Sequence, residues 1–219
     1  MTAVDLSLYG LIDPEHCAGR NPAELARIAA RNGVALLQYR DKRNGVREMV
    51  EIARAMHAAL EGTDIPLLVN DRVDVALAAG ADGVHIGQED MRAEDARRLL
   101  GLDAIIGLSI KTEEDAQTAP FDFIDYACIG GVHETGTKDN KRSIGVDGWK
   151  ELAGIMRARK PGMPVGAIAG FDAANTPEII RAGADGVAYV SALFGKEDVA
   201  AACRDMREII DHARNGDSQ

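Results

Sequence analysis

The six residues AGADGV occur twice in this chain, and the repeat restricts the fold more than any other feature of the sequence. The first copy starts at residue 79 and the second at residue 182, which is 103 residues later in a chain of 219. Each copy ends a helix-like stretch and opens an apolar run. An α/β chain that repeats itself at about half its length is typical of a barrel built from two half-barrels.

Apolar runs alternate with helix-like stretches along the whole chain. We expect strands at 8–12, 35–39, 66–69, 83–87, 104–108, 124–129, 164–168 and 186–190. We expect helices at 22–33, 46–60, 73–79, 91–100, 112–119, 148–159, 176–182 and 196–214. The strands are continuously apolar, as parallel strands buried on both faces require. The pattern predicts a (β/α)8 TIM barrel in a single domain over residues 1–219, with its core at about 8–214.

Composition and charge exclude several classes of protein. Hydrophobic residues make up 46% of the chain and aromatic residues only 4%, which suits the aliphatic layers of a barrel. A net charge of −10 argues against non-specific nucleic-acid binding. No basic-then-apolar signal or membrane-length apolar run is found, so we expect a soluble cytoplasmic protein. Cys17, Cys128 and Cys203 are widely spaced, and we expect buried, reduced thiols.

Polar residues gather at or after the carboxyl ends of the expected strands, where barrel enzymes place their active sites. They are Gln38, Arg40, Lys42, Asn70, Asp71, Gln88, Asp90, Ser109, Lys111, Thr135, Thr137, Lys138, Gly170 and Ser191. Alternation along an extended segment places Gln38, Arg40 and Lys42 on one side. The long stretch 130–147 lacks periodicity, which favours a functional loop that closes over substrate.

Each polar group also has a purely structural explanation. The pair Asn70-Asp71, or Asp90, could simply cap the following helix. His85 lies within an expected strand, which favours a hydrogen-bonded barrel residue over a catalytic base. The common location of these groups on one rim favours function instead.

The kinds of side chain on this rim indicate its chemistry. Asp71 and Asp90, without a nearby Cys or His cluster, suit Mg2+ completed by water and phosphate oxygens. Arg40, Lys42 and Lys138 suit a diphosphate, while Gly170 and Ser191 occupy the usual barrel position for a second phosphate. No nucleophile stands beside a base. The rim therefore favours ionisation of a diphosphate leaving group over covalent catalysis.

Several motifs occur in order at the strand ends. They are QYRDK at 38–42, NDR at 70–72, DGVHIGQED at 82–90, GLS at 107–109, TGTK at 135–138 and VSA at 190–192. With these motifs the chain, from about residue 8 to 194, resembles the thiamine phosphate synthase family. The resemblance implies a TIM-barrel transferase of thiamine biosynthesis. Such an enzyme joins 4-amino-2-methyl-5-hydroxymethylpyrimidine diphosphate to a thiazole phosphate, releasing pyrophosphate by a dissociative, Mg2+-assisted step.

The resemblance also implies roles for individual residues, of which Arg40, Lys42, Ser109 and Lys138 are catalytic. Arg40, Lys42, Asn70 and Lys138 would hold the diphosphate, and Asp71 and Asp90 would bind Mg2+. Ser109 would meet the pyrimidine, and Gln38 would lie in the same pocket. Thr135, Thr137, Gly170, Val190 and Ser191 would surround the thiazole phosphate. The partners implied are these small-molecule substrates, without nucleic acid or membrane, and a homo-oligomer is compatible with the Ala-rich helices.

Three departures from the family pattern are present. Lys111 replaces a His that often follows the fifth strand, and it either adds a cation or points to water. Ala169-Gly170 replaces a double glycine, and Gly130-Gly131 replaces Gly-Pro.

Two alternative functions stay open at this point. A sister family of thiazole tautomerases uses a His directly after the sixth-strand glycine, where this chain has Gly131, with His133 two residues later. A catalytically silent phosphate-binding barrel would have little use for both Asp71 and Asp90.

Overall fold

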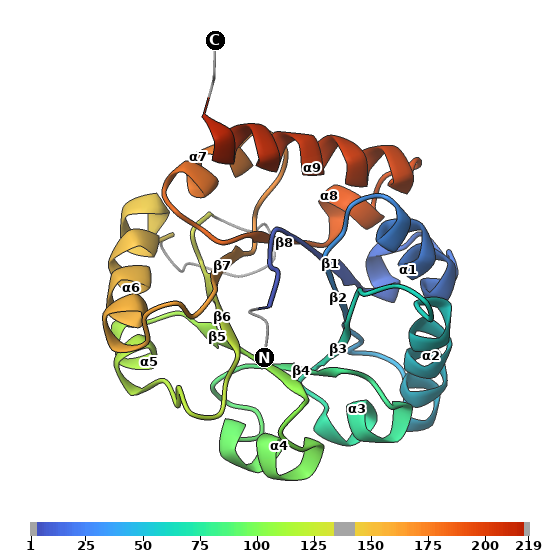
Figure 1. Cartoon of the computed structure of the whole chain (residues 1–219). Coiled ribbons are helices and arrows are strands. Elements are labelled where there is room, and N and C mark those ends of the chain that lie inside the picture. Colours follow the sequence, from blue (N-terminus) through green and yellow to red (C-terminus); the bar gives the residue numbers. More distant parts are fainter. Residues whose placement is uncertain (1–3, 134–142, 217–219) are drawn as a thin grey trace.

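Eight parallel strands close into one barrel in a computed structural model that describes residues 4–133 and 143–216 (Figure 1). The strands are β1 (Leu8–Ile12), β2 (Leu36–Tyr39), β3 (Leu67–Asn70), β4 (Gly83–Ile86), β5 (Ile105–Ile110), β6 (Tyr126–Gly130), β7 (Val165–Ile168) and β8 (Val187–Tyr189). Each strand pairs with the next in sequence, and β8 pairs with β1. The expected (β/α)8 TIM barrel is confirmed.

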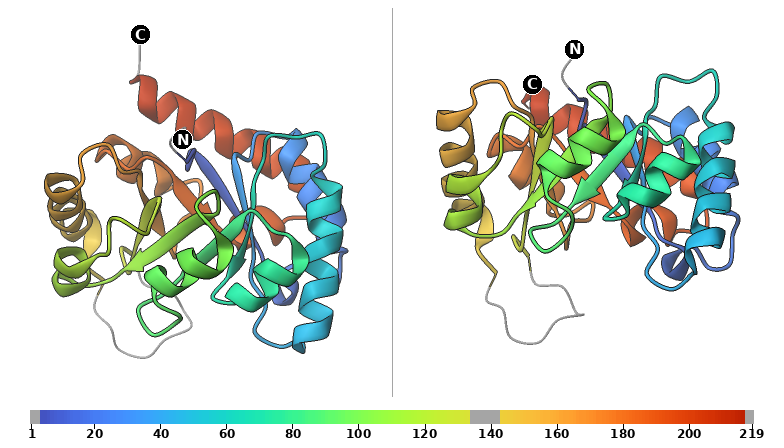
Figure 2. Two further views of the ribbon diagram at one scale, coloured as in Figure 1. Left: turned by 60° about the horizontal axis from the view of Figure 1, so that its bottom comes forward. Right: turned by 90° about the horizontal axis from the view of Figure 1, so that it is seen from below.

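The helices form a ring around this barrel, as the view along it and the two side views show (Figures 1 and 2). They are α1 (Pro22–Arg31), α2 (Val46–Ala59), α3 (Val73–Ala79), α4 (Ala93–Leu100), α5 (Glu113–Thr118), α6 (Gly145–Arg159), α7 (Thr176–Arg181), α8 (Ser191–Phe194) and α9 (Val199–Asn215), with a 3-10 turn η1 (Pro14–His16) after β1. Within the described residues, no helix combines the length and the apolar character needed to cross a bilayer.

Three departures from the expected elements bear on the site, and the other boundaries differ by up to three residues. β5 continues to Ile110, so Ser109 lies within the strand. α6 begins at Gly145, three residues earlier than expected. A short helix, α8, separates β8 from the closing helix, where the sequence predicted one helix alone. A four-residue helix is too short to show a periodic apolar face, so pattern analysis misses it.

The AGADGV repeat turns a helix into a strand, and each of its polar or flexible positions has a structural task. Gly80 and Gly183 adopt left-handed φ values of 71° and 100°, which end the helices. The carboxylates of Asp82 and Asp185 accept hydrogen bonds from backbone N–H groups at the start of the preceding strand, at 2.7 and 2.8 Å. These contacts tie each strand to its neighbour.

The final glycine of each copy lies against the backbone of the next strand. A Cβ atom added at Gly83 would lie 1.8 Å from the carbonyl oxygen of Ile105, and one at Gly186 would lie 1.5 Å from that of Leu6. The repeat therefore helps to close the barrel and takes no part in the chemistry.

Two apolar layers stabilise the barrel. One fills the space between strands and helices and contains most of the buried aliphatic residues. The other is smaller and consists of Leu6, Tyr9, Leu11, Leu36, Leu68, Tyr126, Cys128 and Ala188. Alternate strand residues point to opposite faces, and Tyr9 and Tyr126 meet from non-adjacent strands, so this second layer fills the barrel interior. The cysteines Cys17, Cys128 and Cys203 are buried and free, as expected.

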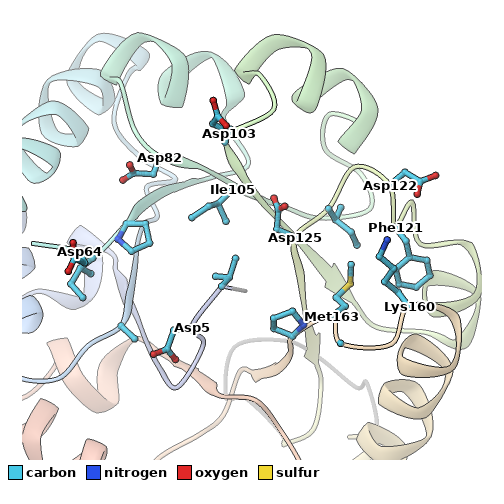
Figure 3. A pocket seen from close by; sticks show the side chains of 18 of the residues that line it. Asp5, Asp64, Asp82, Asp103, Ile105, Phe121, Asp122, Asp125, Lys160 and Met163 are labelled. Atoms are coloured by element: carbon cyan, nitrogen blue, oxygen red, sulfur yellow. The ribbon is translucent and has the colours of Figure 1, made fainter. Parts of the chain in front are cut away.

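A hollow of about 920 Å3 opens at the end of the barrel where the strands begin (Figure 3). Asp5, Asp64, Asp82, Asp103 and Asp125 lie around it. Asp82 and Asp125 accept hydrogen bonds from strand backbone N–H groups, and Asp125 also pairs with Arg97 at 2.7 Å. Carboxylates engaged in this way hold the strand starts together, so the chemistry belongs at the opposite end.

Candidate active site

The two cations that follow β2 lie beside carboxylates of the neighbouring strand ends. The Arg40 guanidinium pairs with Asp13, which follows β1, and the Lys42 ammonium pairs with Asp71, which follows β3. Asp13 is 1% exposed, so Arg40 is held by a buried charge. The expected clamp therefore spans three strand ends, and its cations are positioned by ion pairs before any anion binds.

Asp71 and Asp90 come together at the ends of β3 and β4. Asp71 adopts φ of 59°, a left-handed conformation uncommon for a non-glycine residue, and its N–H donates to the carbonyl of His85 at 2.8 Å. The Asp90 carboxylate accepts a hydrogen bond from the N–H of Gly87 at 2.7 Å. Burial first, and then the neighbouring Asp71, raise the pKa of the Asp90 carboxyl.

Two adjacent carboxylates suit a divalent cation, because such an ion relieves their mutual repulsion. Across the residues that the structure describes, no group of three or more His, Cys, Asp or Glu side chains could hold a metal. The pair would therefore rely on water and substrate oxygens for its remaining ligands, as Mg2+ sites commonly do.

The barrel interior beneath these groups carries a buried chain of polar side chains. Gln38 lies within β2 with no exposed surface, and its Nε2 donates to the Tyr9 hydroxyl. The Tyr9 and Tyr126 hydroxyls are 2.9 Å apart. The His85 ring lies 2.9 Å from Tyr126 through Nδ1 and 2.9 Å from Ser109 through Nε2. Burial lowers the pKa of His85 to about 4, so the ring is neutral at pH 7, in agreement with its expected structural role.

The ends of β7 and β8 form the opposite side of the rim. Ala169 and Gly170 both adopt left-handed φ values, 75° and 77°, and the carbonyl of Gly170 accepts from the Asn175 amide at 2.8 Å. Val190 precedes α8, and Ser191 is its first residue. The extra helix thus starts where a phosphate was expected, a common arrangement in TIM barrels.

The remaining predicted residues are placed as follows. Asn70 is the last residue of β3 and pairs in register with His85, while the Gln88 amide donates to the carbonyl of Ser109 at 2.8 Å. Lys111 is exposed just after β5. Thr135, Thr137 and Lys138 lie outside the described residues, as does half of the expected closing loop, 134–142.

Sequence reasoning missed Asp13, Tyr9 and Tyr126. Asp13 could have been noticed as an acid directly after the first strand. The two tyrosines carried no signal, because a tyrosine within an apolar run is indistinguishable from a core residue.

Comparisons with known proteins identify the family of the chain. The family model for thiamine monophosphate synthase matches residues 8–193. The chain belongs to this family. A thiamine-phosphate synthase of Agrobacterium fabrum is 50% identical over 97% of this chain and 97% of its own, and one of Moorella thermoacetica is 40% identical over 94% and 97%. A solved thiamine phosphate pyrophosphorylase from Pyrococcus furiosus has a TM-score of 0.82 at 34% identity, covering 96% of this chain and 98% of its own.

The family assignment gives the activity. The chain is an enzyme with thiamine-phosphate synthase activity, a transferase of thiamine biosynthesis that condenses a pyrimidine and a thiazole phosphate. The tautomerase and the silent barrel are thereby disfavoured.

Proposed function

We propose that this enzyme works by a dissociative mechanism assisted by Mg2+, with the diphosphate bound across the ends of β2, β3 and β4. The observation that carries the proposal is the meeting of Asp71 and Asp90 beside Lys42, because it combines an acid pair with a cation at one strand-end cluster. An acid pair suits a divalent ion, and the cation suits the phosphate oxygens that this ion would share.

Arg40, Lys42, Asn70 and Lys138 would bind the diphosphate of the pyrimidine substrate. Arg40 and Lys42 already point to the rim through their pairs with Asp13 and Asp71, so little side-chain ordering is needed on binding. Their positive charge favours departure of the diphosphate, which carries away the electron pair of the broken C–O bond. Mg2+ held by Asp71 and Asp90 would supply further neutralisation of that leaving group.

The pyrimidine would lie over the barrel interior between Gln38 and Ser109. Its methylene carbon becomes a cation once the C–O bond has broken, and the thiazole nitrogen then attacks this carbon. The apolar layer beneath the site leaves little space for water that would otherwise capture the cation.

The thiazole phosphate would bind on the opposite side of the rim. Its binding residues are Thr135, Thr137, Gly170, Val190 and Ser191. Support comes from the left-handed turn at Gly170 and from the start of α8 at Ser191, which together present backbone groups at the ends of β7 and β8. We extend the proposal to a cytoplasmic location and to a homo-oligomeric assembly, both of which stay predictions.

The proposal is tested by measuring pyrophosphate release from the pyrimidine diphosphate, the thiazole phosphate and Mg2+. Asp90→Asn removes one carboxylate of the pair and should abolish release at low Mg2+. The matched control is Asp95→Asn, which removes an exposed acid paired only with Arg98 on α4. Unchanged turnover and unchanged Mg2+ dependence in Asp90→Asn would contradict the proposed metal site.

A further inference from the structure

Five side chains from five strands form one continuous chain of hydrogen bonds across the barrel interior. It runs from Gln38 through Tyr9, Tyr126 and His85 to Ser109, with the last three separations each 2.9 Å. Gln38, Tyr9 and Tyr126 are at most 1% exposed. Because these groups are buried, the direction in which each one donates is set by its neighbours.

The first link sets the direction of the whole chain. The Gln38 Nε2 donates to the Tyr9 oxygen, so the single Tyr9 proton is left for Tyr126. Tyr126 in turn donates to Nδ1 of His85, so the ring carries its proton on Nε2, the nitrogen that faces Ser109. That proton is donated to Ser109 Oγ, and the Ser109 hydroxyl keeps its own hydrogen for another acceptor.

Breaking the direction at any link leaves a buried hydroxyl hydrogen without an acceptor, which is unfavourable in an apolar interior. The two ends of the hydrogen-bond chain are therefore coupled. The Gln38 end presents an acceptor, and the Ser109 end presents a donor. At the Gln38 end, the Oε1 atom is buried and has no hydrogen-bond partner among the described residues.

We propose that Tyr9 and Tyr126 are positioning residues that fix Gln38 as a hydrogen-bond acceptor and Ser109 as a donor toward the pyrimidine. This inference rests on the proposed placement of the pyrimidine between Gln38 and Ser109. The substrate matches this polarity, because its amino group donates and its ring nitrogens accept. The same polarity rejects an oxo-pyrimidine, which would direct an acceptor oxygen at Gln38 Oε1.

The acceptor at Gln38 also favours the chemical step. As the C–O bond breaks, the amino group releases electron density to the ring, and its N–H becomes a stronger donor. The hydrogen bond to Gln38 Oε1 therefore strengthens in the transition state, which is the differential binding that increases kcat.

The direction is tested by 15N NMR of the imidazole nitrogens in the substrate-free enzyme, with the His85 signals assigned by their loss in His85→Asn. The expected result is the neutral tautomer with its proton on Nε2. A proton on Nδ1 would reverse the chain and overturn the proposal. Because no substrate is present, this result does not depend on whether the proposed pyrimidine site is right.

The role of the tyrosines is tested kinetically with Tyr126→Phe. We expect the KM for the pyrimidine diphosphate to increase about tenfold with loss of the Nε2-protonated tautomer, while the KM for the thiazole phosphate stays constant. Tyr9→Phe removes the link that sets the direction, so it should increase the pyrimidine KM and weaken the preference of His85 for the Nε2-protonated tautomer.

The matched control is Tyr189→Phe, because Tyr189 is equally buried. Its hydroxyl bonds the Thr176 hydroxyl on α7 at a distance of 2.7 Å and takes no part in the interior hydrogen-bond chain. It should lower the melting temperature to a similar extent without changing either KM. Equal effects of Tyr126→Phe and Tyr189→Phe on the pyrimidine KM, or no effect of Tyr126→Phe, would overturn the proposal.

Discussion

The Lys42 ammonium and the Asp71 carboxylate form an ion pair across the ends of β2 and β3. The pair joins the side chain proposed to bind the diphosphate to one proposed to bind the metal. A diphosphate bridged by a metal would contact both members at once, so the ion pair orders the site before substrate arrives.

Removal of the Lys42 charge should weaken catalysis more than folding. In Lys42→Met we expect kcat/KM for the pyrimidine diphosphate to fall about 100-fold, the scale for loss of one charge-stabilising group. Lys42 is half-exposed, so its pair with Asp71 contributes little to folding, and the melting temperature should change little. Lys150→Met, which removes an exposed lysine on α6, is the control. Equal kinetics for both variants would contradict the clamp.

Asp90→Asn should make the metal-free enzyme more stable at pH 7. The folded state raises the pKa of Asp90, so the charged carboxylate is disfavoured there relative to the unfolded chain. The wild type recovers this difference as the pH falls through the raised pKa of Asp90, and the recovery is complete below the usual pKa of an aspartate. Denaturant unfolding at pH 7 and at pH 4 measures it, and a destabilised variant at pH 7 would contradict the crowded acid pair.

The barrel follows from the sequence, whereas the chemistry assigned to its strand ends stays a prediction. Continuous apolar runs fixed the strand count, and the alternation after residue 38 placed Arg40 and Lys42 together. The interior chain could not be predicted, because Tyr9 and Tyr126 are 117 residues apart and their hydroxyls meet only when the barrel closes. The Asp13–Arg40 pair was missed although Asp13 is an acid directly after the first strand and could have been noticed. The assigned roles of Thr135, Thr137 and Lys138 stay predictions.

The final glycine of each repeat copy, Gly83 or Gly186, should tolerate no side chain. In Gly186→Ala the new Cβ would overlap the Leu6 carbonyl oxygen, so we expect unfolding to become easier by about 3 kcal/mol or more. Gly154→Ala is the control, because this glycine lies in α6 with open space around it, and alanine there should stabilise by about 0.5–1 kcal/mol. Chemical denaturation compares the two, and a mild effect at Gly186 would contradict the close strand approach.

Replacement of Ala169 by glycine should stabilise the folded protein. Its φ of 75° is unfavourable for a residue with a Cβ atom, whereas glycine adopts this conformation readily. We expect Ala169→Gly to increase the free energy of unfolding by up to about 1 kcal/mol, since relief of about 1–2 kcal/mol exceeds the added unfolded-state entropy. Ala174→Gly, in the same loop without a left-handed φ, should destabilise. Thermal unfolding distinguishes the two, and equal losses would contradict the strain.

The thiols should be unreactive in the folded enzyme. Burial raises the pKa of Cys17 to about 11 and those of Cys128 and Cys203 to about 12, so little thiolate exists at pH 8. A chromogenic disulfide reagent should find no rapidly reacting group in the native protein and three after denaturation. One fast equivalent in the native state would contradict the burial of one of them.

The central claim is that Asp71 and Asp90 hold a divalent cation together with the diphosphate. Binding of Mn2+, followed by its electron paramagnetic resonance signal, tests this without turnover. We predict weak binding by the enzyme alone, tight binding with inorganic pyrophosphate present, and loss of the tight phase in Asp71→Asn and Asp90→Asn but not in Asp95→Asn. Tight binding that survives in both site variants would show that the cation lies elsewhere.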